Sequence, residues 1–98
     1  MEKNTNLEIM LKQKIQELGL FLISICDDET KKKDINDTLM DIPFYKIMMF
    51  VSFLNENKID DQINDFIQLF KLNNTIDNRS HIKEQIQFFI SVKEIINE

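Results

Sequence analysis

Hydrophobic residues recur at every third or fourth position over most of this chain, which is the spacing of one face of an α-helix. Three segments show the pattern clearly. They predict helices over residues 6–26, through the hydrophobic positions from Ile59 to Phe70, and from Asn78 or Ser80 to near the C-terminus. The positions that define these faces are Leu7, Leu11, Ile15, Leu18, Leu22 and Ile25, then Ile59, Ile63, Phe66, Ile67 and Phe70, then Ile82, Ile86, Phe89, Ile90 and Ile96.

Residues 42–54 differ from these segments, because they are apolar around the whole circumference of a helix. Only Pro43, Lys46 and Ser52 among the thirteen residues are neither apolar nor aromatic. We predict a helix over residues 43–56, because proline fits the first turn of a helix and disfavours a helical residue before it. A helix that is apolar on all sides must be covered by neighbouring helices or by a partner.

The hydrophobic residues of this helix fall into two stripes at about 100° per residue. One stripe is enough to dock the helix into a core, so the second has two interpretations. Either the helix is central and contacted on both sides, or the second stripe binds a partner, since interfaces are enriched in aromatic residues and Met. The candidate partner-binding residues are Met49, Phe50, Phe53 and the neighbouring Lys46, and the first stripe is Phe44, Ile47, Met48, Val51 and Leu54.

The segment between the first helix and Pro43 predicts a loop and a short helix. Residues 27–33 contain no large apolar residue and no periodicity, which predicts the longest exposed connection. Asp34 is then expected to cap a helical segment over residues 35–40, with Leu39 and Met40 turned inward.

Three local signals complete the expected layout. Thr5 and Glu8 have the spacing of a capping box at the start of the first helix. Gly19 is expected to mark a close helix crossing or a slight bend. Residues 73–75 are turn-prone, and Ile76 is expected to anchor that loop in the core.

These elements predict an all-α fold, a small antiparallel-type bundle of four main helices with a short extra segment before Pro43. We expect residues 1–98 to form a single helical domain, because the sequence shows no repeat and no linker. Alanine is absent, and Gly19 is the only glycine, so neighbouring helices should be widely spaced. The abundance of Ile, Asn and Lys, with a single Arg, indicates an AT-rich genome.

Charge and hydropathy narrow the expected partners and location. The chain has 12 basic and 17 acidic residues, a net charge of −5, which argues against nucleic acid as the main partner. No apolar stretch approaches the length of about 20 residues needed to span a bilayer, and the N-terminal segment lacks the features of a signal peptide. With a single cysteine, Cys26, we expect a cytoplasmic protein without membrane association.

The sequence offers little for catalysis. Cys26 and His81 could form a nucleophile pair only if the fold joined two helix ends, and each is explained more simply by an apolar face and a polar first turn. One His and one Cys cannot supply the usual zinc ligand sets, and phosphate-cradling loops need glycines that are missing here. We therefore expect no enzyme activity, no catalytic residues, no metal and no cofactor.

Carboxylates cluster at the start of the helix predicted over residues 59–70. One interpretation is mimicry, in which such a helix occupies the basic nucleic-acid groove of another protein. The simpler one is an ordinary solvated helix face. The candidate acidic patch consists of Glu56, Asp60, Asp61 and Asp65.

The function expected from these features is protein binding without catalysis. Inhibitors, immunity-type proteins and accessory regulatory factors, of the kind that viruses and plasmids encode, are built in this way. One alternative is a self-associating structural homo-oligomer. Another is a helix-turn-helix-like regulator, in which the helix that follows residues 72–77 contacts nucleic acid through Asn78, Arg79, Ser80, His81 and Lys83.

Overall fold

A computed structural model describes the backbone of residues 2–96 and the side chains of residues 6–96. This part of the chain is all-α, as the sequence predicted, with five α-helices and no strand. The helices are α1 (Glu2–Ser24), α2 (Glu29–Leu39), α3 (Phe44–Phe53), α4 (Ile59–Phe70) and α5 (Ile76–Ile96), with a 3₁₀ turn, η1 (Glu56–Lys58), before α4.

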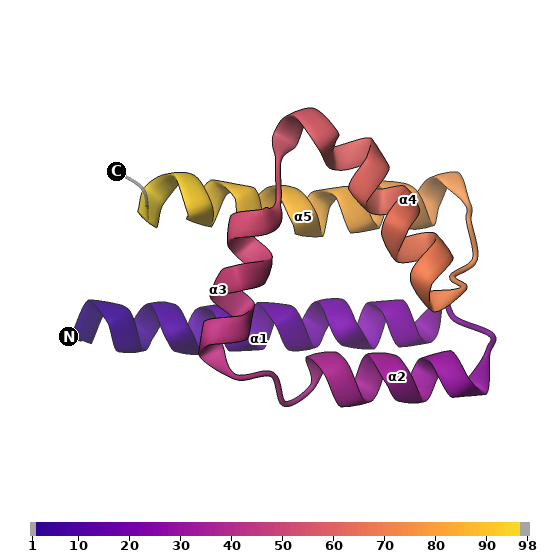
Figure 1. Cartoon of the computed structure of the whole chain (residues 1–98), viewed down its shortest axis with the longest axis horizontal. Coiled ribbons are helices and arrows are strands. Elements are labelled where there is room, and N and C mark those ends of the chain that lie inside the picture. The colour runs from indigo at the N-terminus through magenta and orange to yellow at the C-terminus, as the bar shows by residue number, and fades with distance from the viewer. Residues whose placement is uncertain (1, 97–98) are drawn as a thin grey trace.

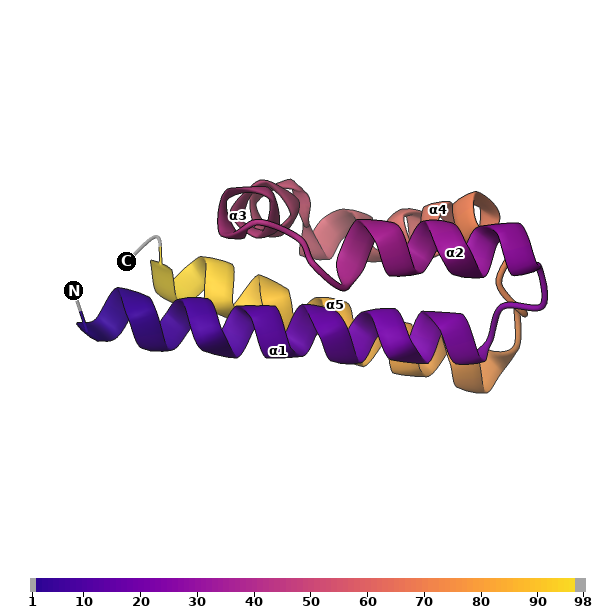
Figure 2. The same cartoon turned by 90° about the horizontal axis from the view of Figure 1, so that it is seen from below.

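The helices form two layers (Figures 1 and 2). The long helices α1 and α5 run in opposite directions in one layer, and α2, α3 and α4 cover them in the other. α1 and α5 meet through long side chains: Phe21 stacks on His81, and the Lys14 ammonium lies 5.1 Å from the centre of the Phe88 ring.

The apolar helix α3 crosses both α1 and α5 at a steep angle, so the fold departs from a regular antiparallel bundle (Figure 1). Its inner face buries Ile47 and Val51, and Leu54 is buried just after its last turn. Because α3 lies in the outer layer, its opposite face is not covered by any other helix of residues 2–96 (Figure 2). α3 ends at Phe53, three residues earlier than the sequence indicated.

The predicted loop over residues 27–33 is wrong, because α2 already begins at Glu29. Its cap is Asp28, not Asp34: the Asp28 carboxylate accepts a hydrogen bond from the Lys31 N–H at 3.0 Å. A helix without apolar residues in its first turns leaves no hydrophobic periodicity to detect. Three ion pairs, each between residues three or four positions apart, help to stabilise these turns of α2. They are Lys31–Asp34, Lys32–Glu29 and Lys33–Asp37.

Two other local predictions are also wrong. Because α1 begins at Glu2, the backbone of Thr5 lies inside the helix and not at its start. Ile76 does not anchor a loop; it is the first residue of α5 and is 83% exposed. α5 starts earlier than predicted because the Thr75 hydroxyl accepts a hydrogen bond from the Asn78 N–H at 3.1 Å, which satisfies a donor of the first turn.

Gly19 marks a close helix crossing, one of the two roles predicted for it. A Cβ atom added at Gly19 would lie 3.2 Å from the Leu39 Cβ and from the Met40 Sδ, tighter than ordinary van der Waals contact. Leu39 is buried and Met40 is half-buried, so both turn inward as expected. α2 therefore packs on α1 more closely than a larger residue at position 19 would allow.

Two hydrogen bonds join the residues just after α1 to the last residue of α4 and to the loop that follows α4. The Cys26 thiol donates to the Phe70 carbonyl at 3.2 Å, and the Asn73 N–H donates to the Ile25 carbonyl at 2.9 Å. Lys71, which ends α4 in the left-handed conformation, places its ammonium 3.5 Å from the Asp28 carboxylate. The start of α2 is thereby joined to the end of α4.

Asp28 gives the fold an acid-sensitive point. The hydrogen bond from the Lys31 N–H, with the Lys71 ammonium nearby, lowers the pKa of the Asp28 carboxyl below its usual 3.8. A carboxyl group whose pKa is lower in the folded state stabilises the fold at pH values above its unfolded-state pKa. This contribution to stability is lost as the pH falls through the folded-state pKa. Asp28→Asn keeps a capping side chain without the charge, so its stability deficit should shrink between about pH 5 and pH 2 in urea titrations. A deficit that stays constant over this range would contradict the assignment.

Candidate functional site

The outer face of α3 presents three large side chains to solvent. Tyr45 is 63% exposed, Met49 is 65% exposed and Phe53 is 76% exposed. They follow one another at four-residue steps, so they form one ridge along the helix. Met49 and Phe53 are therefore not core residues of this fold. Lys46 is exposed beside them.

Phe50, the other aromatic candidate, lies deeper than Met49 and Phe53. It is half-buried, and its ring meets the rings of Phe66 on α4 and Phe89 on α5 edge to face, at centroid distances of 5.9 and 5.7 Å. Such contacts hold a ring in one orientation. The predicted stripe is therefore divided into an exposed part, Met49 and Phe53, and an anchored part, Phe50.

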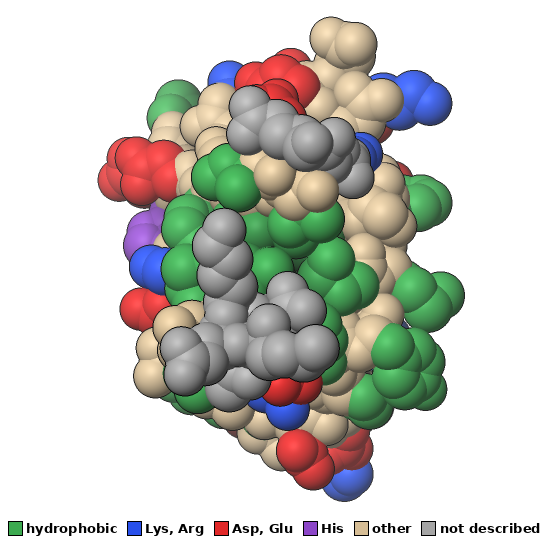
Figure 3. All heavy atoms as spheres, turned by 90° about the vertical axis from the view of Figure 1, so that its left-hand side faces the viewer, with side chains coloured by type: hydrophobic (Ala, Val, Ile, Leu, Met, Phe, Trp, Pro, Cys, Tyr) green, Lys and Arg blue, Asp and Glu red, His purple; other side chains and the backbone are tan. Residues whose placement is uncertain are grey.

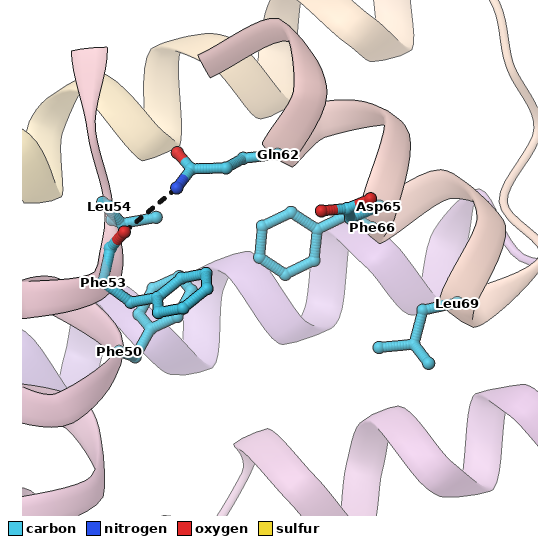
Figure 4. Close-up of a pocket in the computed structure, with 7 residues that line it drawn as sticks. All are labelled: Phe50, Phe53, Leu54, Gln62, Asp65, Phe66 and Leu69. Carbon is cyan, nitrogen blue, oxygen red and sulfur yellow. Dashed lines mark hydrogen bonds between the residues drawn. The ribbon is translucent and has the colours of Figure 1, made fainter. Parts of the chain in front are cut away.

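Between α3 and α4 lies an apolar hollow of about 200 Å³, which we call the α3–α4 groove. Figure 4 shows the rings of Phe50, Phe53 and Phe66 around it, with Leu69 further along α4. The lining residues are Phe50, Phe53, Leu54, Gln62, Asp65, Phe66 and Leu69.

Hydrogen bonds hold the corner from which α3 and α4 diverge. The buried Gln62 amide donates to the Phe53 carbonyl at 3.0 Å (Figure 4). It also accepts a hydrogen bond from the Asn55 N–H at 3.3 Å. From α5, the Lys93 ammonium donates to the carbonyls of Ser52 and Leu54 at 3.0 and 2.7 Å. The carbonyls at the end of α3 thus have partners on two other helices, and the groove is pre-formed.

Gln62→Leu should lower the free energy of unfolding by about 1–3 kcal/mol, because the Phe53 carbonyl and the Asn55 N–H lose their side-chain partner. Chemical denaturation measures this loss. Gln68→Leu, on the exposed face of the same helix, is the matched control and should change stability by less than about 0.5 kcal/mol. Equal effects of the two substitutions would contradict the role of Gln62.

The predicted acidic residues do not all face the groove. Asp65 lines it, and Asp61 lies one helical turn before Asp65 on the same side of α4. Asp60 projects to the other side, where it lines a hollow with residues of α5. Glu56 lines a third hollow, beside Lys93. The exposed carboxylates of the candidate patch therefore belong to three different parts of the surface.

Sequence reasoning missed Tyr45, Leu69 and Gln62 as parts of this surface. Tyr45 was one of many apolar residues in its segment, and Leu69 lay next to core positions of α4. The available signal was spacing: Tyr45 lies four residues before Met49, and Leu69 lies three residues after Phe66. Gln62 carried no sequence signal, because its importance depends on where α3 ends.

Residues proposed for other chemistry are engaged elsewhere. The Cys26 thiol donates to backbone carbonyls, and the His81 ring stacks on Phe21 at a centroid distance of 3.8 Å. The Arg79 guanidinium donates to the side chains of Asn64 and Asn74 at 2.8 and 3.4 Å. Arg79 therefore holds α4 and α5 together, which leaves Ser80 and Lys83 as the more exposed members of the supposed nucleic-acid-reading set. Among the residues whose positions are described, no three His, Cys, Asp or Glu side chains form a group that could hold a metal ion.

Other hydrophobic side chains are exposed away from α3. Figure 3 shows several gathered at the end of the molecule where α1 begins and α5 ends. Ile95 and Ile96, in the last turn of α5, are exposed, as is Leu20 on α1. No helix within residues 2–96 is both long and apolar enough to cross a membrane. The outer face of α3 adjoins the α3–α4 groove, whose lining includes three aromatic rings.

Comparisons of this chain with protein-family models, with curated proteins and with solved structures find no match.

Proposed function

We propose that this protein is a non-enzymatic binding module that holds a protein partner on the α3–α4 groove and the ridge of Tyr45, Met49 and Phe53 beside it. The observation that carries the proposal is the placement of Phe53. Its ring is 76% exposed at the rim of a groove built from other aromatic rings. An aromatic side chain held outward next to an apolar hollow costs solvation in the free protein, and a partner would relieve this cost.

The composition and rigidity of the surface support this proposal. Interface centres are enriched in aromatic residues and Met and depleted of charge, and Phe50, Phe66 and Met49 fit that pattern. The Gln62 and Lys93 hydrogen bonds fix the groove before any partner arrives, which reduces the entropy lost on binding. A small module that acts by occupying a surface fits the role of an inhibitor, an immunity-type protein or an accessory regulator.

Photo-crosslinking in the native host tests the proposal. A photoactivatable phenylalanine derivative replaces Phe53 in one variant and Leu20 in a control variant, since Leu20 is also exposed, at 58%, but lies on α1. We expect a discrete crosslinked protein from position 53 that is missing from position 20. No crosslink at position 53, or the same products from both positions, would refute the proposal.

A further inference from the structure

We infer that the occupant of the α3–α4 groove is a cationic amphipathic helix of the partner protein, with apolar side chains in the groove and Lys or Arg side chains against Asp61 and Asp65. This inference rests on the proposed function and adds the chemistry of the partner. Shape and charge support it independently.

The groove has the size for side chains of another protein. Its volume of about 200 Å³ is below the range of about 300–1,000 Å³ typical of small-molecule sites, and it accommodates one or two large side chains. No buried side-chain nitrogen or oxygen in the described part of the chain lacks a hydrogen-bond partner, so the groove offers no orphaned polar group to a small ligand. A trough between two diverging helices is the shape that an amphipathic helix fills in helix-in-groove recognition.

The charge on the α4 wall is one-sided. The twelve residues of α4 include three carboxylates, Asp60, Asp61 and Asp65, and no Lys, Arg or His. Six ion pairs occur among the described residues; five lie within α1 or α2, and the sixth joins Lys71 to Asp28. The carboxylates of α4 take part in none of them. Among these six pairs, none places a cation against Asp61 or Asp65, so a cation of the partner would complement them.

A second copy of this chain complements the groove less well. Lys46 is the one cation in α3 and α4, so two copies face to face would bring two lysines against four carboxylates from Asp61 and Asp65. Each copy also carries a net charge of −5, which opposes association. A basic helix would bury the same apolar surface, and its positive charges would be attracted to Asp61 and Asp65.

A displayed library of helical peptides tests the inference without knowledge of the partner. The peptides carry Leu, Phe, Met or Ile at the spacing of one helix face, and their flanking positions encode Lys, Glu and Gln with equal frequency. The full-length protein selects binders, and clones that still bind the Phe53→Asp variant are discarded. We expect the remaining clones to be enriched in Lys at positions flanking the apolar face.

Three charge-neutralising variants then separate local pairing from general attraction. At about 0.15 M salt, charges more than about 8 Å apart are largely screened. Asp61→Asn and Asp65→Asn should each weaken a selected peptide about two- to five-fold, as for one exposed ion pair. Asp60→Asn removes the same charge from the opposite side of α4 and should leave binding unchanged. Circular dichroism of each variant checks that α4 is retained.

Four results would overturn the inference. Neutral or acidic clones that depend on Phe53 would show that the groove binds protein without a cationic preference, in which case the proposed function stands. Failure to select any Phe53-dependent clone would exclude a helical occupant of the groove. The proposed function is tested separately, by photo-crosslinking from position 53. An Asp60→Asn effect equal to that of Asp65→Asn would indicate unspecific attraction. A Phe53-dependent dimer in sedimentation would assign the groove to a second copy.

Discussion

Phe89→Ala is expected to lower the free energy of unfolding by about 3–5 kcal/mol, the usual cost of removing a large aromatic ring from a core. Phe89 is 0% exposed, and its ring contacts Phe50 at 5.7 Å and Phe88 at 5.5 Å between centroids. Domains of this size have a total stability of about 5–15 kcal/mol, so the variant should lie close to its unfolding threshold.

Urea denaturation followed by circular dichroism measures this loss. Phe53→Ala is the matched control, since the same atoms are removed from a ring that is 76% exposed, and it should change stability by less than about 0.5 kcal/mol. Similar losses for the two variants would mean that the core is not centred on Phe89. Because Phe50 rests on Phe89, the Phe89 variant should also lose rigidity in the α3–α4 groove.

Phe53→Asp is expected to weaken partner binding about 30-fold or more, while the monomer stays folded. Truncating a central aromatic residue of an interface commonly costs 2 kcal/mol or more, and here a charge would also enter an apolar groove. In the free protein the side chain contributes little to packing because it is mostly exposed. Binding to the protein identified by crosslinking, measured by calorimetry, tests this expectation.

Two variants make the result of Phe53→Asp interpretable. A carboxylate in the last turn of α3 is mildly unfavourable there, so Phe53→Ser, which adds no charge, should show the same loss of binding without that effect. Leu20→Asp places a charge at an exposed site on α1 and should bind normally. Unchanged affinity in both Phe53 variants would refute the role of the groove, and unfolding of both would place Phe53 in the core.

Sequence periodicity predicts those helices whose stability comes from a buried face. α4 lies where Ile59, Ile63, Phe66, Ile67 and Phe70 predicted a helix, because Ile59, Ile63, Ile67 and Phe70 form one buried stripe opposite a polar face. α2 was shortened in the prediction, because only Ile35 and Leu39 are buried in it. Its other turns depend on the Asp28 cap and on lysine–carboxylate pairs, which resemble a charged loop in the sequence.

The surface was predictable only in part, because exposure depends on which helices cross. A helical wheel separates Met49, Phe50 and Phe53 from the first stripe of α3, and in the structure Met49 and Phe53 are exposed while Phe50 is half-buried. It cannot tell that Phe50 would turn toward Phe66 and Phe89 while Phe53 stays outside, since that depends on the angle between α3 and α4. In the same way, the sequence grouped Asp60 with Asp61, although they lie on different sides of α4.

Hydroxyl-radical footprinting of the protein in its native complex, compared with the purified free chain, tests most directly whether the α3–α4 groove is the partner-binding surface. All the side chains compared are exposed in the free protein, so each is open to oxidation there. We predict that Met49, Phe53 and Leu69 are strongly protected in the complex, while Leu20 and Ile76 are oxidised as in the free chain. Equal oxidation of Met49 and Phe53 in both states, with protection elsewhere, would contradict the assignment of the groove.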